Sequence, residues 1–298
     1  MLGRLVAPVL LALCASAKAQ TPPTAAPQSH LESITVEAAR HRELIERQVR
    51  SFVANLAFKP YDSPLARWQT VAPICPLVAG LSREDGEFIL MRVSKIAATA
   101  GAPLAGEHCK PNLYIVVSAD PDALLKAWSR RDVWMFGDEP EQGGTRIRKF
   151  LHANSPIRAW YNAELYSAEG IPRGNGEARS NANVVMTGHA EATRLVFNDT
   201  RDLTSVLIMV DGQRAKGVNF GQLAAYIALI GLAEIRSEAD PADAPTILHL
   251  FSSPETDRPA GLSMWDEAFL KALYHTRHND KQQLAEMKTA MVQDIAPQ

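Results

Sequence analysis

The sequence lacks several features that would narrow its function. It has no apolar run long enough to cross a bilayer, which takes about 20 residues. It also has no basic stripe and no block of like charge, with 31 Lys and Arg residues against 33 Asp and Glu and a net charge of −2. Phosphate binding depends on clustered Lys and Arg, so these absences argue against nucleic acid and exposed anionic membrane as partners.

No internal repeat occurs at the periods of solenoid proteins, and no G-x-S-x-G motif marks a serine nucleophile. "GNG" at 174–176 has neither a preceding strand nor a following helix, so it does not indicate a nucleotide-binding loop. The sequence therefore predicts no cofactor.

The first 19 residues, "MLGRLVAPVLLALCASAKA", are typical of a secretory signal peptide. Arg4 precedes a short apolar run, and the small-residue triplet that ends at Ala19 predicts cleavage there. Lipidation at Cys14 is the alternative, but Leu13 stands before it where a small residue is usual. We expect an exported chain that is periplasmic or secreted.

Domain boundaries follow from changes in composition. Residues 20–32 are rich in Pro, Thr and Ala and predict a disordered tether. Residues 33–280 predict one α+β domain, and 281–298 a helical or disordered tail.

Two cysteines, Cys75 and Cys109, remain once a signal peptide is removed. Each flanks a predicted strand, and an exported chain meets an oxidising compartment. We expect one disulfide between them, and the alternative is two buried thiols that never meet.

The hydrophobic pattern predicts alternating helices and strands, then a run of strands, then two helices. Ser82 and Asp85 have the spacing of a capping box and predict the start of a helix. The expected strands cover 34–36, 113–117, 156–165, 193–197 and 204–211, with the last two joined by a turn over 198–202. This order indicates an α+β fold with a mixed or antiparallel sheet and packed helices.

The segment 217–235, "GVNFGQLAAYIALIGLAEI", predicts a buried helix with a narrow polar stripe. Asn219, Gln222 and Tyr226 form that stripe. An apolar turn, "PTILHLF", and a final helix, "LSMWDEAFLKALY", follow it.

This ending resembles the catalytic half of the metzincin-type zinc peptidases, or zincins. In that family the active helix carries H-E-x-x-H, a tight turn passes beneath the metal, and a helix with an L-S-x-x-D…L-Y pattern closes the domain. Alignment puts Gln222 and Tyr226 at the two histidines and Leu223 at the general base. None of these side chains can replace the originals, so the resemblance implies a degenerate, zincin-like C-terminal half without a metal, a pseudoenzyme.

The whole chain is also similar to an uncharacterised family of exported bacterial proteins. Its landmarks here are "ITVEA", "CPLVAGL", "CKPNLYIVVSADPDALLKAW" and "RAWYNAEL". That resemblance implies an exported, disulfide-bonded domain and carries no activity.

Other metal ligands are poorly supported by spacing. His275 and His278 have helical spacing without a third donor nearby, and His108 stands beside a cysteine expected to be oxidised. His189 and His249 each stand alone in the sequence, and an isolated histidine more often has a structural role than a catalytic one.

Polar residues inside apolar or aromatic segments indicate a binding site better than these histidines indicate a metal site. We expect a binding groove lined by Asn219, Gln222, Tyr226, Arg158, Trp160 and Asn162. Its partner would be an extended peptide or an envelope component, bound without catalysis. Alternatives are that these residues only satisfy buried backbone groups, that the chain is a hydrolase of envelope peptides or glycans, or that it needs a partner chain.

Overall fold

The computed structural model describes residues 28–58, 64–131, 136, 140–166, 199–241, 243–277 and 282–296. The chain divides into two units, 1–41 and 42–298. The described part of the first unit, 28–41, is the beginning of helix α1 (Gln28–Leu56). The candidate site lies in the second unit.

The expected strand at 34–36 is wrong, because α1 is helical throughout this stretch. Two alternating apolar residues are a weak strand signal. The residues that follow, "EAARHRELIERQ", include many strong helix formers, and their preference for helix prevails. The helix begins at Gln28, within the range expected for the tether.

The second unit has the α+β fold expected, and of the two sheet types considered the mixed one is correct. The elements after α1 are β1 (Pro76–Ala79), α2 (Arg83–Ala100), β2 (Leu113–Ser118), α3 (Pro121–Arg131), α4 (Pro140–Leu151), β3 (Ile157–Tyr166), β4 (Thr200–Asp211), α5 (Phe220–Leu232), the short 3-10 helices η2 (Ile247–Phe251) and η3 (Glu255–Asp257), α6 (Met264–His275) and α7 (Gln283–Ile295).

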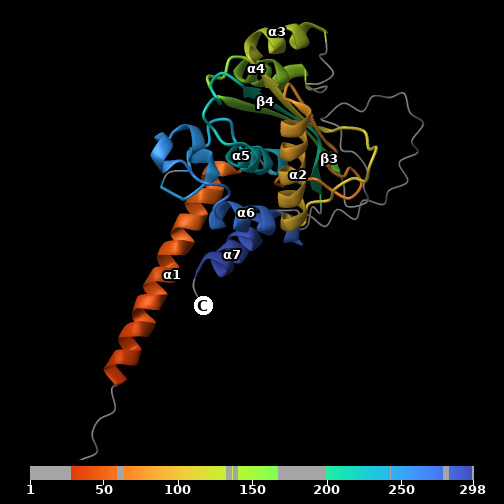
Figure 1. The fold of residues 1–298 in the computed structure, drawn as a ribbon. Helices are drawn as coiled ribbons and strands as arrows, with labels where there is room; N and C mark the ends of the chain where they lie inside the picture. Colours follow the sequence, from red (N-terminus) through yellow and green to blue (C-terminus); the bar gives the residue numbers. More distant parts are fainter. Residues whose placement is uncertain are drawn as a thin grey trace, which may run out of the picture. The chain divides into compact units, whose positions relative to one another are not determined.

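Four strands form one sheet in the order β1-β2-β4-β3 (Figure 1). The first three are parallel, and β3 lies antiparallel beside β4 at one edge. β4 already begins at Thr200, so the turn expected over 198–202 is wrong at its last three residues. The strand expected at 193–197 lies outside the described residues.

Helices cover both faces of this sheet. On one face, β2, β3 and β4 share a large core with α2, α5, α6 and α7. On the other face, α3 and α4 enclose a smaller core of Leu125, Phe136, Phe150, Trp160, Leu207 and Met209. As the strand pattern predicted, Arg158 and Trp160 point to one side of β3 and Tyr161 to the other.

The expected disulfide is present between Cys75 and Cys109, with a Cα–Cα distance of 5.9 Å. It closes a loop that contains β1 and α2. The Ser82 hydroxyl accepts a hydrogen bond from the Asp85 N–H, which confirms the predicted helix start. Gly80 has a φ of +87°, and a Cβ there would lie 1.8 Å from the Val117 carbonyl oxygen, so only glycine fits.

Helix α7, within the range expected for a tail, buries Met287 and Met291 in the large core. Among the described residues, no helix combines the length and the apolar character needed to cross a bilayer.

Candidate functional site at the edge strand

A pocket of about 500 Å³ runs along β3, within the size range of ligand sites. Five consecutive residues of the strand, 157–161, line it. α4 forms one wall, α5 and η2 form another, and residues 234–239 lie between them. The pocket is therefore a groove whose floor includes the backbone of an edge strand.

The register of β3 determines which backbone groups face this groove. Ile157 lies opposite Val210, and the Asp211 N–H donates to the Pro156 carbonyl over 2.8 Å. In an antiparallel ladder, alternate residues bond to the neighbouring strand, so positions 158 and 160 bond to β4. The N–H and C=O groups of Ala159 and Tyr161 consequently point away from β4.

No described strand pairs with β3 on that outer side. The Ser155 hydroxyl donates to the Ile157 carbonyl over 2.7 Å, which engages one outward acceptor at the beginning of the strand. An unpaired row of backbone groups is a template for adding another strand. The edge between Ala159 and Tyr161 is thus suited to bind an extended peptide.

Arg146 of α4 contacts two aromatic rings at the groove. Its guanidinium carbon lies 5.5 Å from the ring centre of Phe58 and 5.1 Å from that of Trp160. Contact with two aromatic faces fixes the orientation of the planar guanidinium.

Glu234 is the first residue of the lining segment 234–239. Its carboxylate is buried and paired with Arg201, and Arg146 approaches it to 3.8 Å. A buried carboxylate needs charged partners of this kind. The Phe58 N–H donates to the Glu234 carbonyl over 3.1 Å, which ties the chain after α1 to this segment.

Two tyrosines contribute to the groove with their hydroxyl groups protonated. The Tyr161 hydroxyl donates to the Ile230 carbonyl over 2.8 Å, and burial raises the pKa of this side chain far above its ordinary value. Burial also raises the pKa of Tyr226 to about 12. Neither offers an anionic oxygen to a metal at neutral pH.

The polar stripe of α5 divides between two locations. Asn219 and Gln222 form a capping box, in which the Asn219 side chain accepts from the N–H groups of Gly221 and Gln222. The Gln222 amide also donates to the Pro259 carbonyl over 2.8 Å. Tyr226 lines the groove and contacts the ring of Phe251 in η2, whereas Asn219 and Gln222 do not line it.

The polar and aromatic residues expected from β3 also lie in different places. Trp160 and Arg158 line the groove, but Asn162 does not. Asn162 instead accepts from the Trp160 indole N–H over 3.0 Å and donates to the Ser205 hydroxyl over 2.7 Å. Of the six residues expected in the groove, the structure brings Arg158, Trp160 and Tyr226 together there.

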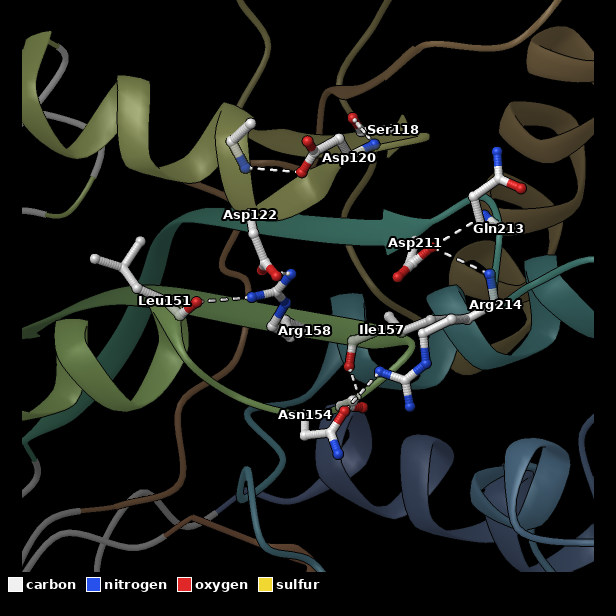
Figure 2. Close-up of polar contacts among 12 residues, drawn as sticks. Ser118, Asp120, Asp122, Leu151, Asn154, Ile157, Arg158, Asp211, Gln213 and Arg214 are labelled. Carbon is white, nitrogen blue, oxygen red and sulfur yellow. Dashed lines mark hydrogen bonds and ion pairs between the residues drawn. The ribbon is translucent and has the colours of Figure 1, made fainter.

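Figure 2 shows how Arg158 is held at the beginning of β3. Its guanidinium donates to the Asp122 carboxylate over 2.8 Å and to the Leu151 carbonyl over 2.9 Å. Asp122 belongs to α3 and Leu151 to α4, so the buried Arg158 side chain links these two helices to β3. Arg158 is therefore a structural member of the groove wall.

The acidic residues near the carboxyl ends of β2 and β4 serve the local backbone. Asp120 accepts from the Ala123 N–H at the start of α3, and Asp211 accepts from the N–H groups of Gln213 and Arg214 (Figure 2). Both are turn and cap contacts of a common kind. They need no ligand to explain them.

After α5 the chain continues through η2 and η3 to α6. η2 packs against α5, and Asp266 of α6 connects the two parts of this ending. The buried Asp266 carboxylate accepts from the Thr246 hydroxyl over 2.5 Å, from the Ile247 N–H over 2.8 Å and from the Ser263 N–H over 2.9 Å. Desolvation raises the pKa of this carboxyl above its ordinary value.

The histidines considered as ligands have ordinary contacts. A ring nitrogen of His249 lies 3.1 Å from the Ala244 carbonyl, and one of His275 lies 2.8 Å from the Lys271 carbonyl. His278 and His189 lie outside the described residues. The described part of the chain contains no group of three or more His, Cys, Asp or Glu side chains placed to hold a metal ion.

Comparison with protein-family models, with curated proteins and with solved structures finds no match.

Sequence reasoning missed the residues that form the other walls, chiefly Phe58, Arg146, Ile230 and Glu234. No local pattern indicates them, since they come from separate elements and meet only in the folded chain. The capping role of Gln222 had a signal, because Asn219 and Gln222 have capping-box spacing.

Proposed function

We propose that the mature chain is an exported, noncatalytic binding domain that takes an extended peptide as an added strand on β3. The observation that carries this proposal is the groove of about 500 Å³ lined by five consecutive residues of an edge strand. Main-chain hydrogen bonds would supply affinity, and the side walls would supply selectivity.

The zincin resemblance supports the absence of catalysis. At the positions of the metal ligands and the general base the chain has a capping amide in Gln222, a neutral phenol in Tyr226 and the buried Leu223. The succession of β4, α5, η2 and α6 agrees with a degenerate zincin-like half. In this proposal the cleft persists as a binding groove.

Export is part of the same proposal. The signal-like first residues, the disulfide and the absence of a membrane-spanning helix among the described residues are compatible with it. We expect the protein recovered from the periplasm or medium to begin at Gln20, as measured by intact mass. A product that keeps residues 1–19 would contradict export by cleavage after Ala19.

Substitution of Ala159 by proline tests the binding mode. Proline removes the outward N–H at a position that does not bond to β4, and edge strands tolerate proline in that setting. The probe is a phage-displayed library of random linear peptides, selected on the disulfide-bonded mature protein. We expect peptides selected on the natural chain to lose affinity for Ala159→Pro by about tenfold or more.

Ala159→Ser is the matched control, because it changes the side chain and keeps the N–H. It should bind the selected peptides like the natural chain, and thermal unfolding should show that both variants are folded. Failure to select any peptide, or equal binding by Ala159→Pro, would overturn the proposal. Cleavage of the selected peptides would favour the hydrolase alternative.

A further inference from the structure

A second pocket, of about 640 Å³, lies where α2, α5 and α6 pack against one another. These three helices contribute to the large core on the same face of the sheet. The pocket shares no lining residue with the groove along β3. Its size falls in the range of sites for small molecules. It is therefore a candidate site of its own.

Small residues create the hollow between these helices. Ala100 of α2, Ala225 of α5 and Ala268 of α6 are buried and line it. An alanine has no side chain beyond its Cβ, so helices that meet through alanines leave space between them. The other apolar lining residues are Ile96, Leu262, Met264 and Leu270. The interior of the pocket is consequently apolar.

Two cations of α2, Arg92 and Lys95, also line the pocket, and both are exposed. Neither side chain makes a hydrogen bond or an ion pair with any residue that the structure describes. They are three positions apart, so they lie on the same face of the helix. The Arg92 guanidinium reaches the first turn of α5, because a Cβ at Gly221 would lie 3.8 Å from its Nη2. Both cations can therefore contact a ligand in the pocket.

The other charged side chains of the lining leave an excess of positive charge. Lys271 and Asp294 are paired over 2.8 Å, so their charges cancel. Glu267 lies in the first turn of α6, where the helix dipole favours a carboxylate. It has no ion-pair partner within the described part of the chain and would repel an anion. Two cations against one unpaired carboxylate leave a net positive lining.

We propose that this pocket binds an amphipathic acid, a single alkyl chain that ends in a carboxylate. The carboxylate binds Arg92 and Lys95 through charge-assisted hydrogen bonds, which are stronger than those of neutral groups. The alkyl chain lies against Ile96 and the three alanines, where its removal from water is favourable. This site is distinct from the groove along β3, so the inference does not depend on the proposed function.

Amphiphiles that share one alkyl chain and differ in the head group test this inference. The probes are decanoate, the uncharged decanol and the cationic decyltrimethylammonium, each below the concentration at which it forms micelles. Isothermal titration calorimetry with the disulfide-bonded mature protein measures each affinity at neutral pH. We expect decanoate to bind about tenfold or more tightly than decanol, and decyltrimethylammonium to bind most weakly.

Charge variants identify the residues responsible. Arg92→Gln and Lys95→Gln should each lower the affinity for decanoate by a few-fold, and the double variant should abolish the preference for decanoate over decanol. Glu267→Gln should act in the opposite direction, because it removes a like charge from the pocket. All three side chains are exposed, and thermal unfolding should show that the variants are folded.

Arg83→Gln is the matched control on the same helix. Arg83 is exposed, is paired with Glu87 over 2.7 Å and does not line the pocket. Its substitution also removes one positive charge from α2, so a general effect of net charge would appear in this variant as well. We expect the control to bind all three amphiphiles like the natural chain.

Several results would overturn the inference. They are equal affinity for decanoate and decanol, no binding of decanoate, and a preference that survives the double variant. Binding to vesicles of phosphatidylglycerol by a chain that binds no decanoate would also overturn it, in favour of a membrane surface. Decanoate that displaces library-selected peptides would instead place its site in the groove along β3. Loss of decanoate binding in the double variant, with peptide binding unchanged, is the result expected.

Discussion

Gln222 shows how one side chain can satisfy two structural needs at once. Its amide oxygen accepts from the Asn219 N–H and its amide nitrogen donates to the Pro259 carbonyl. Both partners are backbone groups that would otherwise need another partner. These contacts account for a polar residue at this position of an otherwise apolar helix.

Gln222→Ala should therefore lower stability and leave binding intact. Loss of the cap predicts a decrease of about 1 kcal/mol in the free energy of unfolding, measured by urea denaturation. Gln222→Glu retains an acceptor for the Asn219 N–H and should lose less. A fall in affinity for library-selected peptides equal to that of Ala159→Pro would contradict the capping role.

We expect Asp202 of β4 to make a pH-dependent contribution to the free energy of unfolding. It is buried, one carboxylate oxygen has no hydrogen-bond partner, and desolvation raises its pKa from the ordinary 3.8 in spite of nearby Arg67. The folded state thus holds this proton more tightly than the unfolded state. Its stabilising effect is complete below 3.8 and is lost as the pH rises through the raised pKa.

Comparison with Asp202→Asn isolates this effect. The unfolding free energy of the natural chain minus that of the variant should fall as the pH rises from 3.8, at no more than about 1.4 kcal/mol per pH unit. Urea denaturation over the acidic range measures it. A difference that rises with pH would show that Asp202 is instead stabilised as an anion.

Among the elements, periodicity predicts the pocket-lining strand β3 and the central strand β2 well. The apolar run of β2 and the alternation of β3 predict these strands within one or two residues of their bounds. Local capping chemistry predicts the start of α2 equally well. The expected strand at 34–36 failed because a short alternation cannot outweigh the helix formers that follow.

The groove could be predicted only in part, because most of it is tertiary. Arg158, Trp160 and Tyr226 were found because polar groups in apolar segments are conspicuous. Arg146 and Glu234 look like ordinary charged residues in sequence, and only the fold brings them to β3.

The disulfide is an element-scale constraint on β1 and α2. Replacing both Cys75 and Cys109 with alanine should lower the free energy of unfolding by about 4 kcal/mol in the chain-entropy model for a sequence separation of 34. Urea denaturation measures the change, and reduction of the natural chain should give a similar loss. Two free thiols in the denatured, unreduced protein would contradict the bridge.

In the second unit as a whole, β3 is an edge strand of a mixed sheet. Helices cover both faces of the sheet, and the described chain leaves the outer side of β3 without a neighbouring strand. An edge strand without a neighbour carries a risk of unwanted pairing with another chain.

Amide hydrogen exchange on the complex with a library-selected peptide tests whether the peptide pairs with β3. We expect saturating peptide to slow exchange at the N–H groups of Ala159 and Tyr161 by about tenfold or more, because they become bonded to the added strand. The Trp160 N–H, already directed to β4, should change little. Peptide binding that leaves the exchange of Ala159 and Tyr161 unaltered would show that the peptide does not add a strand to β3.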